Sequence, residues 1–145
     1  VSSVRDEYDY ILIDCSPSLN LVTINVLTTA DSVIIPVEAS YLSMAGLQQL
    51  LASIGSTKRK LNRKLEVEGI VINKVNTRTN HEKDIIEKLR EAYGSQIKVF
   101  DVMIPESVRA KECTAYGHSI YKHDPKCKVA RAFEELTKEV LAYGC

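Results

Sequence analysis

Four short apolar runs, each the length of a β-strand, alternate with helical patterns along this chain, and this alternation limits the possible folds more than any other feature. The runs are Tyr10–Ile13, Ser32–Val37, Glu68–Asn73 and Val99–Ile104. Three of them are nearly continuous in apolar residues, which is typical of parallel strands that are covered on both faces. The sequence therefore predicts a mostly parallel sheet.

Apolar residues at helical spacing follow the last three runs. They extend from Leu47 to Leu61, from Ile85 to Tyr93 and from Val129 to Val140. Strands that alternate with helices predict an α/β fold in three layers, with the sheet flanked by helices. Because the chain has 145 residues and no repeats or linkers, residues 1–145 are expected to form a single domain.

The composition is that of an ordinary folded protein, with 45% apolar and 26% charged residues. Nineteen basic residues balance nineteen acidic ones, so any binding to nucleic acid or to a membrane must come from a local patch. No signal peptide or long apolar run indicates secretion or a membrane span. The first residue is Val1 and not methionine, which suggests a fragment.

The four cysteines are scattered and are expected to be reduced thiols. One string combines metal-ligand residue types, in C-x4-H-x4-H-x3-C spacing: Cys113, His118, His123 and Cys127. Structural zinc sites favour closely spaced cysteine pairs, which this string lacks. We therefore expect loop thiols and imidazoles here, with a zinc module as the alternative.

Ligands of open parallel sheets bind beyond the carboxyl ends of the strands. Asp14 directly follows the first run, where a carboxylate can hold nucleotide-bound Mg²⁺, often through water. From the residues alone, a turn-forming or helix-capping aspartate, a phosphoacceptor or a metal-hydrolase aspartate would look the same. Asn73, at the end of the third run, is by itself better explained as a cap or turn residue.

Longer segments resemble the ParA/Soj partition ATPases, in the order in which that family carries them. They are YDYILIDCSPSLNLVTINVLTTADSVIIPVEASYLSMAGLQQLL from Tyr8 to Leu51, then GIVINKVNTRTN, VFDVMIPESVRAKEC and YGHSIYKHDPKCKVARAFEELTKEVL. The resemblance extends from about Tyr8 to Leu141 and implies a P-loop NTPase-like fold. This family belongs to the deviant Walker A group, alongside the MinD proteins and the nitrogenase iron protein.

The resemblance implies a nucleotide site with ATP and Mg²⁺ as cofactors. Asp14 matches the Walker B aspartate, which is linked to Mg²⁺ through water, and residues 15–18 match the second switch segment. Asn73 matches the asparagine that reads the adenine edge, since an amide can both donate and accept hydrogen bonds. Pro105 and Glu106 match the loop that packs on the purine ring.

The family's glycine-rich phosphate loop is absent from this sequence. The six glycines are isolated, and no Gly-Lys pair occurs. The chain thus resembles the C-terminal part of a partition ATPase that lacks the N-terminal phosphate-loop strand. Alone, it is expected neither to hydrolyse ATP nor to hold a cofactor tightly. Cys113-Thr114 and Cys127 also depart from the family's usual Ala-Pro and Ser.

The resemblance further implies partners for the full-length protein: DNA bound without sequence preference, a ParB-like centromere-binding protein, and a second copy in an ATP-dependent homodimer. Arg78 and Arg109 match arginines that the family uses for DNA. The denser basic run, Lys58–Lys64, is better explained as a solvated helix end. The chain's end, ARAFEELTKEVLAYGC, lacks the basic face of a membrane-binding helix. We expect a protein of the bacterial cytoplasm, associated with the nucleoid.

Two function classes remain open at this stage. The first is the C-terminal segment of an ATP-driven DNA-segregation switch. The second is a truncated, non-catalytic interaction module with the same fold. A sequence like KGGVGKTT upstream of Val1 would favour the first.

Overall fold

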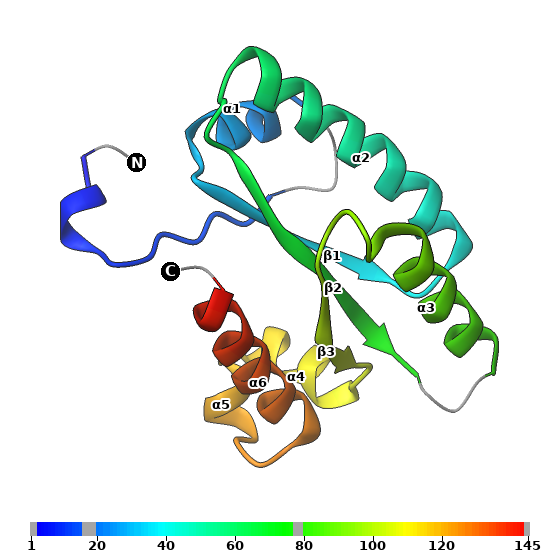
Figure 1. Cartoon of the computed structure of the whole chain (residues 1–145). Coiled ribbons are helices and arrows are strands. Elements are labelled where there is room, and N and C mark those ends of the chain that lie inside the picture. The colour runs from blue at the N-terminus through cyan, green and yellow to red at the C-terminus, as the bar shows by residue number, and fades with distance from the viewer. Residues whose placement is uncertain (1–2, 16–19, 77–79, 144–145) are drawn as a thin grey trace. The chain divides into compact units, whose positions relative to one another are not determined.

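The computed structural model describes residues 3–15, 20–76 and 80–143 (Figure 1). Three strands form its sheet in the order β1-β2-β3, and β2 and β3 run parallel. The predicted class, a parallel sheet flanked by helices, is confirmed. In chain order the elements are a 3-10 turn (η1, Arg5–Glu7), α1 (Leu21–Thr29), β1 (Ser32–Glu38), α2 (Tyr41–Lys60), β2 (Glu66–Val75), α3 (Asn80–Tyr93), β3 (Val99–Pro105), α4 (Val108–Tyr116), α5 (Ile120–His123) and α6 (Lys128–Tyr143).

Contacts divide the chain into two compact units. The first contains Val1–Val33 and Gln48–Glu66, and the second contains Ile34–Leu47 and Val67–Cys145. That residues 1–145 form a single domain stays a prediction.

In the first unit, two asparagines fix the ends of α1. The Asn20 side chain accepts hydrogen bonds from the N–H groups of Val22 and Thr23 at 3.0 and 3.1 Å, which is an ordinary N-cap. After α2, the Asn62 amide donates to the carbonyl oxygens of Leu27 and Ala30 at 3.1 and 2.8 Å. The last carbonyl groups of α1 therefore have partners, and the segment after α2 is attached to them.

The predicted buried strand at Tyr10–Ile13 is wrong for this structure. No strand is formed there, and the four side chains are 36–93% exposed, Leu12 most of all. A strand exists only when its N–H and C=O groups pair with a neighbour, and the strands in the described part of the chain do not pair with this segment. Apolar composition without a partner strand is not sufficient.

In the second unit, β2 is buried on both faces. Three successive residues, Ile70, Val71 and Ile72, are 0–6% exposed, as their continuous apolar run predicts. The register places Ile70 opposite Val99 and Val75 opposite Pro105, with irregularities between. At Gly69, a Cβ atom would lie 2.8 Å from the Lys98 carbonyl oxygen, so this close approach of β2 to β3 requires glycine.

Helix α6 packs against β3, as Figure 1 shows. The core of this contact consists of Val71, Phe100, Ile104, Val129 and Ala132. The apolar spacing from Val129 to Val140 thus correctly predicted a helix with one buried face.

A second contact joins α6 to β3 through charge. The Glu139 carboxylate accepts hydrogen bonds from the N–H groups of Asp101 and Val102 at 3.1 and 3.2 Å. It also lies 3.2 Å from Lys98 Nζ, and the two side chains are only 14% and 24% exposed. Burial works against the ionised carboxylate, but the two N–H groups and the ammonium outweigh it and hold the pKa of Glu139 below its ordinary value of 4.5.

None of the described helices is both long enough and apolar enough to span a bilayer.

Candidate functional site

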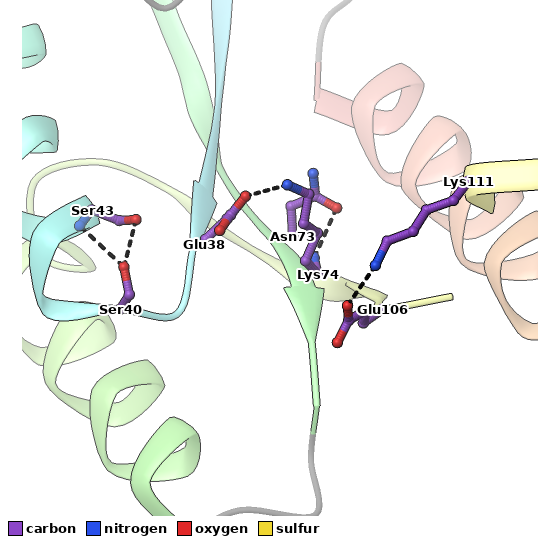
Figure 2. Close-up of polar contacts among 7 residues, drawn as sticks. All are labelled: Glu38, Ser40, Ser43, Asn73, Lys74, Glu106 and Lys111. Carbon is purple, nitrogen blue, oxygen red and sulfur yellow. Dashed lines mark hydrogen bonds and ion pairs between the residues drawn. The ribbon is translucent and has the colours of Figure 1, made fainter. Parts of the chain in front are cut away.

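In the second unit, the carboxyl ends of the three strands present polar and charged side chains (Figure 2). β1 ends at Glu38, β2 carries Asn73 and Lys74 near its end, and β3 ends at Pro105 with Glu106 next to it. The Glu106 N–H donates to the Val75 carbonyl oxygen at 3.1 Å, which continues the β2–β3 contact past the last strand residue. The two segments that were predicted to contact the purine, Asn73 and Pro105–Glu106, therefore lie at the ends of adjacent strands.

Charges alternate across this edge of the sheet. Lys74 Nζ forms an ion pair with Glu38, and Lys111 Nζ on α4 lies 3.0 Å from Glu106 Oε1. The hydrogen bond and charge of Glu38, with a smaller contribution from Glu106, raise the pKa of Lys74 above its ordinary value of 10.5. Lys74 is therefore protonated at neutral pH and carries the positive charge that attracts Glu38. Glu38 and Lys74 lie at strand ends, where the sequence predicted ligand-binding residues, although it assigned them no role. Lys111, on α4, was not predicted.

The backbone at Lys74 is in the left-handed region, with φ 54°. This conformation is uncommon for a residue other than glycine. The Asn73 Oδ1 atom accepts a hydrogen bond from the Lys74 N–H at 2.9 Å and so stabilises this local conformation. In this respect Asn73 acts as the turn residue that its sequence alone suggested.

A purine contact remains compatible with the Asn73 amide. Its carbonyl oxygen has a second lone pair and its nitrogen has two hydrogens, so it can still accept and donate. A nearby cavity of about 350 Å³ is within the usual size of a ligand pocket. Its lining residues are Val75, Met103, Pro105, Lys128, Arg131, Ala132 and Glu135. Val75, Met103, Pro105 and Ala132 give this cavity apolar walls, and its charged side chains are those of Lys128, Arg131 and Glu135.

Ser40 and Ser43 are hydrogen-bonded to each other, so the position of their side chains is explained without a ligand. The Ser40 hydroxyl oxygen accepts the Ser43 N–H at 3.2 Å and lies 2.8 Å from the Ser43 hydroxyl. This is the capping arrangement expected just before a helix, and α2 begins at Tyr41.

Asp14 belongs to the first unit, where it is exposed and follows the unpaired segment Tyr10–Ile13. Among the described residues, no group of three or more histidine, cysteine or acidic side chains could hold a metal. A lone carboxylate fits Mg²⁺ only when nucleotide phosphates supply further oxygens. Asp14 is compatible with that role. Residues 16–18 of the expected switch segment lie outside the described residues.

The members of the Cys/His string make contacts within the protein. His123 Nε2 lies 3.5 Å from Glu112 Oε2, and its ring stacks on Tyr116 with 5.9 Å between the centroids. Cys113 is buried, and the Cys127 sulfur accepts the N–H of Ala130 at 3.4 Å. His123 and Cys127 therefore have partners within the protein. The expectation of loop residues is wrong for Cys113, which lies in α4, and for His123, which ends α5.

We expect elemental analysis of the purified chain to find no stoichiometric zinc, because closely spaced ligand pairs are missing. The double variant Cys113→Ser/Cys127→Ser should have the same metal content as the wild type. One zinc per chain that disappears in this variant would establish the metal module instead.

Of the two arginines that were predicted to bind DNA, the structure describes one. Arg78 lies outside the described residues. Arg109, on α4, is 60% exposed, and its Nε atom lies 3.3 Å from Asp124 Oδ2. The basic run is located as expected, because Lys58, Arg59 and Lys60 form the last turn of α2, where the helix dipole favours cations.

Comparison with known proteins identifies relatives along the whole chain. A family model described as an AAA domain matches residues 1–67. The sporulation initiation inhibitor protein Soj of Bacillus subtilis is 40% identical over 144 residues, which is 99% of this chain and 56% of that protein. The chromosome partitioning protein ParA of Myxococcus xanthus is 40% identical over 135 residues, 93% of this chain and 47% of that protein.

Two solved structures show the same fold. Apo McdA from Cyanothece has a TM-score of 0.82 at 22% identity, covering 96% of this chain and 55% of that one. Cobyrinic acid a,c-diamide synthase from Mycobacterium smegmatis, with a bound ATP analogue and magnesium, has a TM-score of 0.79 at 26% identity, covering 97% and 50%. The P-loop NTPase-like fold is thus confirmed.

The chain spans about half the length of the curated relatives that it matches. These relatives are 35–40% identical in sequence to this chain over more than nine-tenths of its length. By sequence, this chain is therefore similar to part of the ParA/Soj partition ATPases along nearly its whole length, which confirms the resemblance that its motifs indicated.

Proposed function

We propose that this chain is the C-terminal segment of a ParA/Soj-like ATPase that acts in chromosome or plasmid segregation. The observation that carries the proposal is the 40% identity to Soj over 99% of the chain. The full-length protein would use ATP and Mg²⁺ and would act in the bacterial cytoplasm, at the nucleoid.

The predicted site residues would contribute to nucleotide binding in different ways. Asn73 would hydrogen-bond the purine edge, while Pro105 and Glu106 would cover the ring; their position on adjacent strand ends supports this assignment. Asp14 would hold a water molecule on Mg²⁺, which neutralises phosphate charge when it is bound. The phosphates themselves would need a loop that this sequence does not contain.

The proposed partners of the full-length protein are DNA, a ParB-like protein and a second copy in the ATP-bound state. The names of the ParA relatives, chromosome partitioning proteins, support this class of partner. Because the chain has no net charge, DNA binding must rest on a local surface, and exposed Arg109 is a candidate for it.

Changing Arg78 and Arg109 together to alanine in the full-length protein should weaken binding to all DNA sequences. Each lost phosphate contact lowers the slope of log K against log salt by about 0.9, so the slope should fall by up to about 1.8. Titrations of random-sequence duplexes at several salt concentrations measure both quantities.

The matched control removes a different pair of arginines, Arg59 and Arg63, which are exposed at the end of α2 and in the segment after it. This variant should bind DNA nearly as the wild type does. If the Arg78/Arg109 variant kept the wild-type affinity and slope, the assignment of these two residues would be wrong.

The 145-residue chain alone should neither hydrolyse ATP nor bind it tightly, because contacts to a purine without anchored phosphates are weak. Calorimetry should detect little or no binding, and phosphate release should equal the protein-free control. Asp14→Ala, prepared in parallel, detects contaminating host ATPases. Turnover that is lost in this variant would refute the prediction.

The non-catalytic module is the second candidate, and the missing glycine-rich loop is the observation that favours it. A full-length protein that contains no such loop and shows no turnover would establish this second function.

A further inference from the structure

The ion pair between Arg109 and Asp124 joins a more exposed side chain to a less exposed one. Asp124 ends α5: its N–H donates to the Ile120 carbonyl oxygen at 2.8 Å, and its own carbonyl oxygen accepts the Cys127 N–H at 3.2 Å. The Asp124 side chain is 27% exposed, while that of Arg109 is 60% exposed. The backbone of Asp124 is therefore hydrogen-bonded on both sides, and more of the guanidinium than of the carboxylate is exposed to solvent.

The charges around Asp124 are unbalanced. Asp124 is the only acidic residue between Glu112 and Glu134 in the sequence. The same stretch contains four lysine and arginine residues: Lys122, Lys126, Lys128 and Arg131. In a chain without net charge, this stretch is a local basic segment with one carboxylate inside it.

The neighbouring ion pairs do not involve Arg109. Lys111, on the same helix, is paired with Glu106, and Glu112 lies 3.5 Å from the Nε2 atom of His123. Asp124 is thus the carboxylate within ion-pair distance of Arg109 in the described part of the chain.

We propose that Asp124 restrains Arg109 in the unbound protein, and that DNA binding exchanges this carboxylate for a phosphate group. The inference rests on the proposed function, since it concerns regulation of the same DNA surface. Partly exposed ion pairs are weak, so a phosphate can replace the carboxylate. Asp124 therefore lowers the affinity for DNA without preventing binding, and it makes Arg109 available only in exchange for a stronger anion.

Asp124→Asn keeps the size of the side chain and removes its charge. In the full-length protein, this change should tighten binding to a random-sequence duplex about two- to fivefold at low salt, the range expected for an exposed pair. The gain should disappear when Arg109→Ala is combined with it. Tightening that persists in the double variant would overturn the inference.

Glu112→Gln is the matched control, since it removes one negative charge from α4 without touching the Arg109 pair. Any gain in this variant measures the general effect of charge and should be unchanged by Arg109→Ala. If Glu112→Gln tightened binding as much as Asp124→Asn and showed the same dependence on Arg109, a specific restraint would be excluded.

A second measurement does not depend on DNA. Phenylglyoxal modifies guanidinium groups, and mass spectrometry can follow Arg109 with Arg90 as internal reference, because Arg90 donates to the carbonyl oxygens of Val99 and Phe100. Asp124→Asn should accelerate modification of Arg109 about two- to fivefold relative to Arg90.

An unchanged modification rate would overturn the inference, whatever the DNA titrations show. Faster modification together with no DNA binding by any form, wild type included, would instead refute the proposed DNA-binding function, and the exchange step with it.

Discussion

Asp14→Ala in the full-length protein is expected to lower the rate of ATP hydrolysis at least about 100-fold, because a metal ion contributes several kcal/mol of charge stabilisation to such reactions. The carboxylate would hold the water through which Mg²⁺ is bound. In the 145-residue chain Asp14 is exposed, so the same change there should alter the free energy of unfolding by less than about 0.5 kcal/mol. Phosphate release and thermal unfolding measure the two effects separately.

Asp9→Ala is the matched control for Asp14. Asp9 is also exposed and lies in the same stretch without regular secondary structure, so its removal tests whether any negative charge there affects turnover. Asp9→Ala should hydrolyse ATP normally. Normal turnover in Asp14→Ala would refute the Walker B assignment, and a fall in both variants would indicate a non-specific effect of charge.

Glu139→Ala is expected to reduce the stability of this chain by about 1–3 kcal/mol, the cost of leaving partly buried N–H groups and a partly buried ammonium group without their partner. The change removes the acceptor of two N–H groups of β3 and separates Lys98, whose side chain is 24% exposed, from its counter-ion. Urea unfolding followed by circular dichroism measures the loss.

Glu134→Ala provides the comparison on the same helix. Glu134 pairs with Lys138 at 2.8 Å, but both side chains are more than half exposed, so its removal should cost no more than about 0.5 kcal/mol. Equal losses of unfolding free energy in the two variants would show that the contact of Glu139 with β3 stabilises the chain no more than an exposed ion pair does.

The pH dependence provides an independent test of Glu139. Because its pKa is lowered in the folded state, its stabilisation is complete above 4.5, the ordinary value, and is lost as the pH falls through the folded value. Glu139→Gln should therefore be less stable than the wild type at neutral pH and should lose less stability below pH 4.5. A parallel loss in both proteins would contradict this assignment.

Strands β2 and β3, which pair with each other, were predictable from the sequence. The run Glu68–Asn73 lies within β2 and Val99–Ile104 within β3. Their apolar character correctly indicated strands; β2 is covered on both faces, whereas Asp101 in the middle of β3 is exposed. The same reasoning failed at Tyr10–Ile13, although this run is also apolar. Pairing is a property of two segments, and one segment's composition does not reveal whether its neighbour is present.

The candidate site was also predictable only in part. Strand ends in a parallel arrangement correctly indicated where Asn73, Pro105 and Glu106 lie, since the carboxyl ends of parallel strands share one edge. Their roles stay predictions. The ion pairs of Lys74 with Glu38 and of Arg109 with Asp124 join residues 36 and 15 positions apart, and no local spacing indicates them.

The sequence by itself determined the type of fold and the ParA/Soj relationship, because apolar periodicity and motif order are local properties that are read along one segment at a time. Only the tertiary structure decided which charges meet. Glu139 reaches the N–H groups of Asp101 and Val102 because α6 packs on β3, and Asp124 meets Arg109 because α5 packs on α4. The physical reason is that an ion pair or side-chain hydrogen bond depends on distances of about 3–4 Å, which are set by packing and not by position in the chain.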